Sequence, residues 1–87
     1  MRYTVLWRPS AEQRLAELWL AGPERAAIAA AANAIDRALA ADPDTKGEAR
    51  AGSTRVLVED PLAVYFQVSE PDRLVTVWAV WRWRAAP

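Results

Sequence analysis

The stretch from Arg55 to Arg82 holds most of the large apolar residues of the chain and constrains its fold most. Apolar and polar residues alternate in its first two runs, and the third run is nearly all apolar, β-branched or aromatic. Two polar segments that contain proline and aspartate separate these runs. This pattern predicts three antiparallel strands joined by turns. The predicted strands are residues 55–60, 62–68 and 74–82.

Alternation also predicts which side chains of these strands face a core. The choice for the last strand leaves Arg82 in water, because that strand is apolar on both faces. The residues expected to face inward are Val56, Val58, Leu62, Val64, Phe66, Val75, Val77, Ala79 and Trp81. The opposite, open face is then expected to carry Arg55, Tyr65, Trp78 and Arg82.

The N-terminal half predicts one strand followed by two helices. Residues 2–7 alternate as a strand does, and Ser10 is expected to cap a helix that runs to about Ala21. Pro23 suits the first turn of a second helix, which is expected to end near Ala41. Residues 42–54 are polar and predict a loop.

This order of elements predicts a single α+β domain over residues 1–87. Its elements are an N-terminal strand, a helical hairpin and a three-stranded antiparallel meander. We expect the helices to pack on one face of the sheet and to leave the other face open.

The composition excludes several kinds of chemistry. The chain has no cysteine and no histidine, so it has no disulfide, no thiolate metal site and no histidine-dependent triad. We therefore expect no metal and no cofactor. The net charge is zero, so nucleic-acid binding would need a local basic patch. The sequence has no apolar run long enough for a membrane span and no signal-peptide pattern, which predicts a cytoplasmic protein that meets no membrane.

Three segments, taken in order and at this length, resemble the RelE/ParE superfamily of toxins from bacterial type II toxin–antitoxin systems. They are YTVLWRPSAEQRLAEL, DPDTKGEARAGSTRVLVEDPLAVYFQV and RLVTVWAVWR. The resemblance implies an antitoxin partner that wraps the toxin. It also implies one of two activities. RelE-like members cleave messenger RNA on the ribosome, whereas ParE-like members inhibit DNA gyrase and are not nucleases.

The residues of the RelE-like nuclease are only partly present. Arg55 matches the basic residue at the start of the family's second strand, and Arg82 matches the arginine after its last strand. Ala63 stands where an arginine is usual, and the usual C-terminal tyrosine has no counterpart. Lys46 is the candidate for the loop lysines of some members, with Arg50 beside it.

Arginine and aromatic side chains together bind single-stranded RNA through phosphate pairing and base stacking. We therefore assign candidate roles in two groups. Arg55, Arg82 and Tyr65 are candidate catalytic residues, and Arg50, Lys46, Trp78 and Arg84 are candidate RNA-binding residues. With no histidine, the general base would be Tyr65, Glu48 or Glu59. The alternative for each arginine is a solvated strand-end charge, and for each ring an ordinary sheet aromatic.

Trp19 and Trp83 are candidate contacts for the antitoxin, because tryptophan is enriched in interface hot spots. The alternatives are a core position for Trp19 and a disordered tail for Trp83. Three functions stay open at this point: a ribosome-directed toxin, slightly favoured; a ParE-like toxin that acts on gyrase; and a toxin-derived module that only binds its partner.

Overall fold

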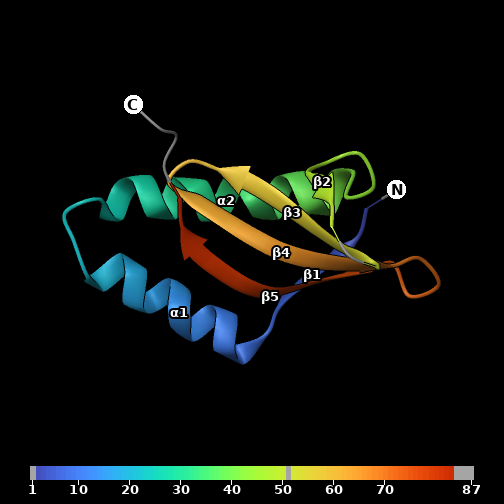
Figure 1. Ribbon diagram of the computed structural model, residues 1–87, viewed down its shortest axis with the longest axis horizontal. Coiled ribbons are helices and arrows are strands. Elements are labelled where there is room, and N and C mark those ends of the chain that lie inside the picture. Colours follow the sequence, from blue (N-terminus) through green and yellow to red (C-terminus); the bar gives the residue numbers. More distant parts are fainter. Residues whose placement is uncertain (1, 51, 84–87) are drawn as a thin grey trace.

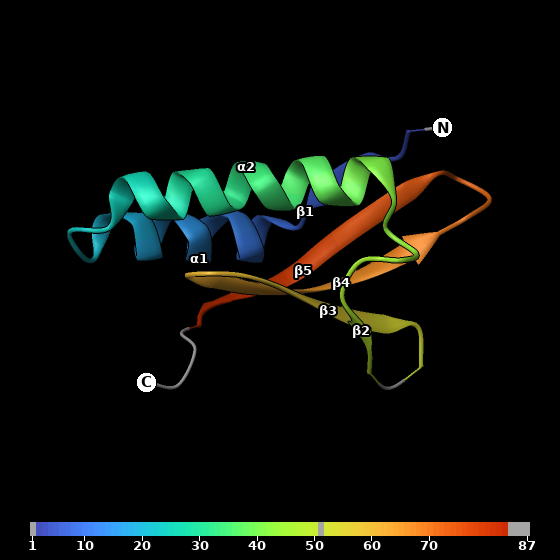
Figure 2. The same cartoon turned by 90° about the horizontal axis from the view of Figure 1, so that it is seen from above.

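The computed structural model describes residues 2–50 and 52–83. Within these residues the chain forms two helices and one five-stranded sheet. The elements are β1 (Thr4–Trp7), α1 (Pro9–Leu20), α2 (Arg25–Ala41), β2 (Glu48–Ala49), β3 (Thr54–Glu59), β4 (Leu62–Ser69) and β5 (Leu74–Arg82). Both helices lie on the same side of the twisted sheet, as Figures 1 and 2 show from two directions. The α+β class and the one-sided packing are therefore as predicted.

The strands are arranged in the order β1-β5-β4-β3-β2. The first strand pairs in parallel with the last one, and the remaining neighbours are antiparallel. The predicted loop over residues 42–54 contains β2, a two-residue edge strand. So short a strand has no periodicity to read, which is why the sequence did not reveal it.

The core lies between the helices and the sheet. From the helices it receives Ala11 and Leu18 of α1 and Ile28, Ala31, Ile35 and Leu39 of α2, whereas Trp19 is 40% exposed. From the sheet it receives apolar side chains of three strands. The buried residues of this cluster include Ala11, Leu18, Ile28, Ala31, Ile35, Leu39, Leu57, Leu62, Val64, Phe66, Val75, Val77 and Val80.

The prediction that Val56 and Val58 face the core is wrong. Leu57 pairs with the buried Val64, so Leu57 faces the helices and its two neighbours face the open side. Val58 is 40% exposed there. Because three successive apolar residues fill this strand, alternation alone could not decide its orientation.

The last strand changes face along its length. Its register with β4 shifts between Tyr65 and Phe66, where Tyr65 pairs with Ala79 but Phe66 pairs with Val77. Trp78 is the extra residue of this β-bulge, and a bulge of this kind reverses the alternation beyond it. Val80 therefore faces the core in place of the predicted Ala79 and Trp81.

The helix boundaries also differ slightly from the predicted ones. Arg8, not Ser10, is the N-cap of α1, because Pro9 already occupies the first helical position. Glu24 is the N-cap of α2, so Pro23 lies just outside that helix. Neither helix has a side-chain cap. No helix among the described residues is long and apolar enough to cross a membrane.

Candidate functional site

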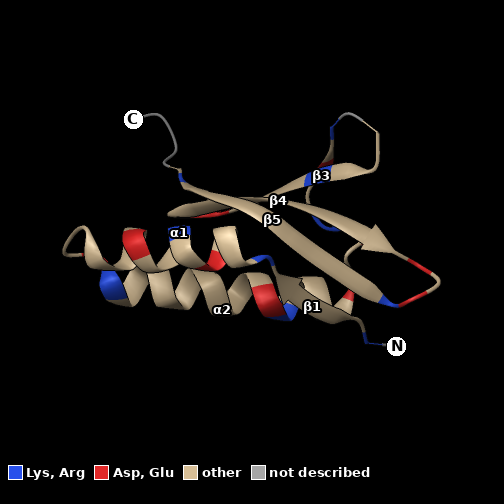
Figure 3. Ribbon diagram, turned by 90° about the horizontal axis from the view of Figure 1, so that it is seen from below, with Lys and Arg blue, Asp and Glu red and all other residues tan. Residues whose placement is uncertain are grey.

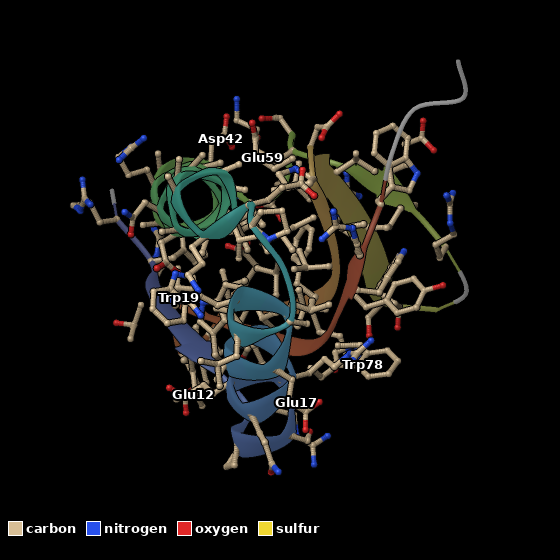
Figure 4. The ribbon with its side chains drawn as sticks, turned by 90° about the vertical axis from the view of Figure 1, so that its left-hand side faces the viewer. Glu12, Glu17, Trp19, Asp42, Glu59 and Trp78 are labelled. Carbon is tan, nitrogen blue, oxygen red and sulfur yellow. The ribbon has the colours of Figure 1, made fainter. Side chains whose placement is uncertain are left out.

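The open face of the sheet carries a cluster of three aromatic rings. Tyr65 stacks on Trp78 with ring centroids 5.3 Å apart and planes inclined by 20°. On its other side Tyr65 contacts Trp81, with centroids 4.7 Å apart and planes inclined by 53°. Figure 4 shows Trp78 on the side of the sheet that faces away from the helices. Tyr65 and Trp78 thus lie on the predicted face, and Trp81 joins them because of the bulge.

Arg82 does not lie on this open face, and that prediction is wrong. Arg82 pairs in register with Leu62, which is fully buried on the helix side. Its guanidinium forms an ion pair with Glu24, the residue that precedes α2. The shift of register at the bulge causes this placement, because it moves the odd and even positions of the strand end to opposite faces.

Arg55 also lies on the helix side, opposite to the predicted face. It pairs with the buried Phe66, four residues along β4 from Leu62. Its Nε and Nη2 donate to the carbonyl oxygen of Lys46, and Nη2 also donates to that of Gly47, each at 3.2 Å. Arg55 therefore clamps the loop before β2, and it lies far from Arg82 on the sheet. The catalytic roles of both arginines remain predictions.

The other predicted RNA-binding residues are spread over the molecule. Lys46 is exposed in the loop before β2. Arg50 lies just after β2 and pairs with Glu48 at 3.3 Å, with both side chains at least half exposed. Arg84 lies outside the described residues. Arg50 thus lies at the β2 edge of the sheet, where Glu48 neutralises its charge.

Arg8 is a residue of the open face that the sequence analysis missed. With Gln67, Thr76 and Trp78 it lines a hollow of about 240 Å³. The indole N–H of Trp78 is buried and has no hydrogen-bond partner in the described structure. A basic residue directly before a helix, in place of the usual Ser, Thr, Asp or Asn, was the signal that could have revealed this position.

A second, larger groove lies between the two helices. It measures about 480 Å³, and Trp7, Leu15, Trp19 and Ala32 are among the residues that line it. Figure 4 shows Trp19 beside the two helices, far from Trp78. The guanidinium of Arg25 lies 4.6 Å from the centre of the Trp19 ring, a cation–π contact that holds this ring at the rim.

Trp83, the other predicted antitoxin contact, directly follows β5. Its backbone N–H donates to the carbonyl oxygen of Pro61 at 2.8 Å, and its side chain is half-buried. Trp83 therefore lies at the end of the sheet, directly after Arg82, which pairs with Glu24. The alternative of a disordered tail does not hold at Trp83 itself, and the rest of the tail lies outside the described part of the chain.

A pair of carboxyl groups lies at the opposite end of the sheet. The hydroxyl of Tyr3 donates to Glu70 at 2.7 Å and lies 3.5 Å from Asp44. The hydrogen bond to Glu70 raises the pKa of Tyr3 and lowers the pKa of Glu70. A hydrogen bond to Glu70 raises the pKa of Asp44. This cluster links the start of β1 to two loops, and no group of residues suited to a metal ion occurs in the described ranges.

Comparison with solved structures shows which known proteins share this fold. A chain of the RelBE2 toxin–antitoxin complex from Mycobacterium tuberculosis superposes with a TM-score of 0.75 at 20% identity, over 99% of this chain and 95% of the matched chain. The chain has the RelE/ParE toxin fold. The chromosomal ParDE system of P. aeruginosa gives a TM-score of 0.70 at 17% identity, with 95% and 98% of the two chains covered.

The isolated RelE toxin of E. coli has the same RelE/ParE fold, with a TM-score of 0.68 at 13% identity over 97% of this chain and 87% of that one. No family model and no curated protein matches the sequence. The resemblance drawn from the order of the sequence segments is thus confirmed at the level of the fold.

Proposed function

We propose that this chain is the toxin of a type II toxin–antitoxin pair and that it acts in the cytoplasm by binding a protein target. The RelE/ParE fold supports the toxin role, because similar chains come from the RelBE2 and ParDE systems. DNA gyrase is the first target to test, since the ParE resemblance implies it. An antitoxin that covers the toxin is the expected partner.

The placement of Arg55 and Arg82 favours a mechanism of binding over one of RNA cleavage. RNA cleavage needs charge stabilisation at the phosphate, and in the family resemblance these two arginines would supply it. Here both lie on the helix side of the sheet, and each has a partner within the chain. The described open face instead offers rings, which suit a protein interface.

Two assays test this mechanism. Purified toxin should inhibit supercoiling by DNA gyrase and should leave messenger RNA intact on translating ribosomes. Trp81→Ala, which removes a ring from the open face, should weaken the inhibition, whereas Arg82→Ala should retain it. Cleavage of messenger RNA by the wild type, lost in Arg82→Ala, would refute the binding mechanism.

A ribosome-directed toxin is the second candidate. The stack of Tyr65, Trp78 and Trp81 favours it, because aromatic side chains also stack on unpaired bases. Such a toxin would block translation by occupying RNA without cutting it. Inhibition of a translation reaction with intact messenger RNA, and without effect on gyrase, would favour this candidate.

The groove between α1 and α2 is the proposed antitoxin surface. It is lined mainly by apolar residues and lies beside the exposed Trp19. A short open reading frame next to the gene is the expected source of the antitoxin, and its co-expression should relieve growth arrest.

Trp19→Ala should weaken that neutralisation and leave growth arrest by the toxin alone unchanged. Leu20→Ala is the matched control, because Leu20 is also on α1, is 62% exposed and does not line the groove. Equal neutralisation of Trp19→Ala and the wild type would remove the groove from the antitoxin interface.

A further inference from the structure

The hollow at Arg8 gathers hydrogen-bond donors. Arg8 follows β1, Thr76 and Trp78 come from β5, and Gln67 comes from β4. Within the described ranges, the guanidinium of Arg8 has no hydrogen-bond or ion-pair partner, and the buried indole N–H of Trp78 has no acceptor. Unsatisfied donors beside an accessible hollow favour a ligand that brings acceptor oxygens.

The start of α1 adds positive potential at the same place. The first amide groups of a helix lack partners within it and give its N-terminus a partial positive charge. Acidic or hydroxyl caps usually offset that charge, but Arg8 is the N-cap here and makes no side-chain cap. A cation at this end of a helix is unfavourable until an anion neutralises it. A carboxylate or a phosphate group would meet both needs, because it is an anion and its oxygen atoms accept hydrogen bonds from the donors of the hollow.

The charge of the open face decides which of these two groups fits. Across the sheet from Arg8, Arg50 and Glu48 neutralise one another. Figure 3 shows charged residues in the turn that joins β4 to β5 and at the end of β5, whereas the remainder of these two ribbons is free of them. Among the described residues, Arg8, directly after β1, is therefore an isolated cation at the edge of this face, not part of a row of cations. A nucleic acid carries a negative charge at each nucleotide and needs a row of cations.

The surroundings of the hollow are apolar. Leu6 pairs in register with Thr76, which lines the hollow, and is 51% exposed. Trp78, which also lines the hollow, stacks on Tyr65. We propose that this face docks a segment of the target protein that places one Asp or Glu carboxylate in the Arg8 hollow and an adjacent apolar side chain against Leu6 and Trp78. This assignment rests on the proposed function, in which the toxin binds a protein target.

Selection of random peptides displayed on phage against the full chain tests this assignment. Enriched peptides should carry Asp or Glu beside an aliphatic or aromatic residue. Synthetic copies should bind Arg8→Gln about tenfold or more weakly than the wild type, because a charge-assisted hydrogen bond is lost. Copies with Gln in place of Glu should lose affinity similarly. In an NMR spectrum of the indole groups, the Trp78 N–H signal should shift on binding.

Arg50→Gln is the matched control, because Arg50 is an exposed arginine on the same side of the sheet but is already paired with Glu48. It should bind the peptides as the wild type does. Peptides without an acidic residue, equal binding by Arg8→Gln, or no enrichment at all would overturn the assignment. So would displacement of the peptides by a single-stranded oligonucleotide at lower concentration. Growth arrest that persists in any of these cases leaves the toxin role standing.

Discussion

Arg82 and Glu24 form an ion pair that joins the end of β5 to the turn between the two helices. Their side chains are 36% and 29% exposed, so water only partly screens the pair. The contact holds the helical hairpin against the sheet at the end where the chain leaves the sheet. The strand-end arginine, which the family resemblance links to RNA cleavage, therefore has a structural partner here.

The first prediction concerns the stability that this ion pair contributes. Arg82→Gln and Glu24→Gln should each lower the free energy of unfolding by about 0.5–1 kcal/mol, the upper range for partly exposed pairs. The double variant should lose less than the sum of the two, and the coupling should shrink in high salt. Urea denaturation of the four proteins measures this. Strictly additive losses would show that the two residues act independently.

Much of the fold could be predicted from periodicity, because the large elements have a clear apolar pattern. Both helices and four of the strands follow it, and so does the outward placement of Tyr65. The outward placement of Trp78 is correct, but it rested on the choice that left Arg82 in water. The RelE/ParE fold followed from the order of these elements. Of the candidate site, the aromatic part could be predicted and the arginine part could not.

Arg55 was misplaced because the three successive apolar residues of β3 left its orientation open. The errors at Arg82 and Arg8 have two other physical causes. The bulge at Trp78 depends on how β5 pairs with β4, and pairing between distant segments leaves no local pattern. The start of α1 depends on competition between Pro9 at the first helical position and Ser10 as a cap, and the proline prevailed. Arg82 was misplaced by the first cause, and Arg8 was overlooked because of the second.

The second prediction concerns the clamp that Arg55 forms on the loop before β2. Arg55→Gln should lower the free energy of unfolding by about 1–2 kcal/mol, because the backbone carbonyls of Lys46 and Gly47 lose their donor. The backbone amides of residues 46–50 should exchange their hydrogens faster. Arg50→Gln, which breaks an exposed pair, should change stability by less than about 0.5 kcal/mol. Unchanged exchange in Arg55→Gln would show that the clamp does not order the loop.

The third prediction compares two glycines of the same loop region. Gly47 has φ +72°, and a Cβ there would lie 2.1 Å from the carbonyl oxygen of Val56. Gly47→Ala should therefore cost roughly 2–4 kcal/mol, through both backbone strain and the clash with β3. Gly52 has φ +61° but open space around it, so Gly52→Ala should cost only about 1 kcal/mol. Equal thermal melting temperatures for the two variants would contradict the clash.

The fourth prediction concerns the pH dependence of the Tyr3 cluster. The Glu70 carboxylate accepts a hydrogen bond from Tyr3 and raises the pKa of that phenol above its ordinary 10.0. A raised pKa in the folded state stabilises the protein below the pKa of the unfolded chain. This stability is lost as the pH rises through the folded value. The wild type should therefore lose stability in alkali as Tyr3 ionises, and Glu70→Gln should lose less.

The Tyr3 titration can be followed by ultraviolet absorbance in a Tyr65→Phe background, where Tyr3 is the remaining tyrosine. Glu70→Gln should move the titration to lower pH, because the neutral amide no longer repels the phenolate and no longer holds its proton. The same variant removes a carboxylate whose pKa is lowered by folding, so it should also abolish the stability that this group provides above pH 4.5. An unchanged Tyr3 titration in Glu70→Gln would mean that Glu70 does not hold the tyrosine proton in solution.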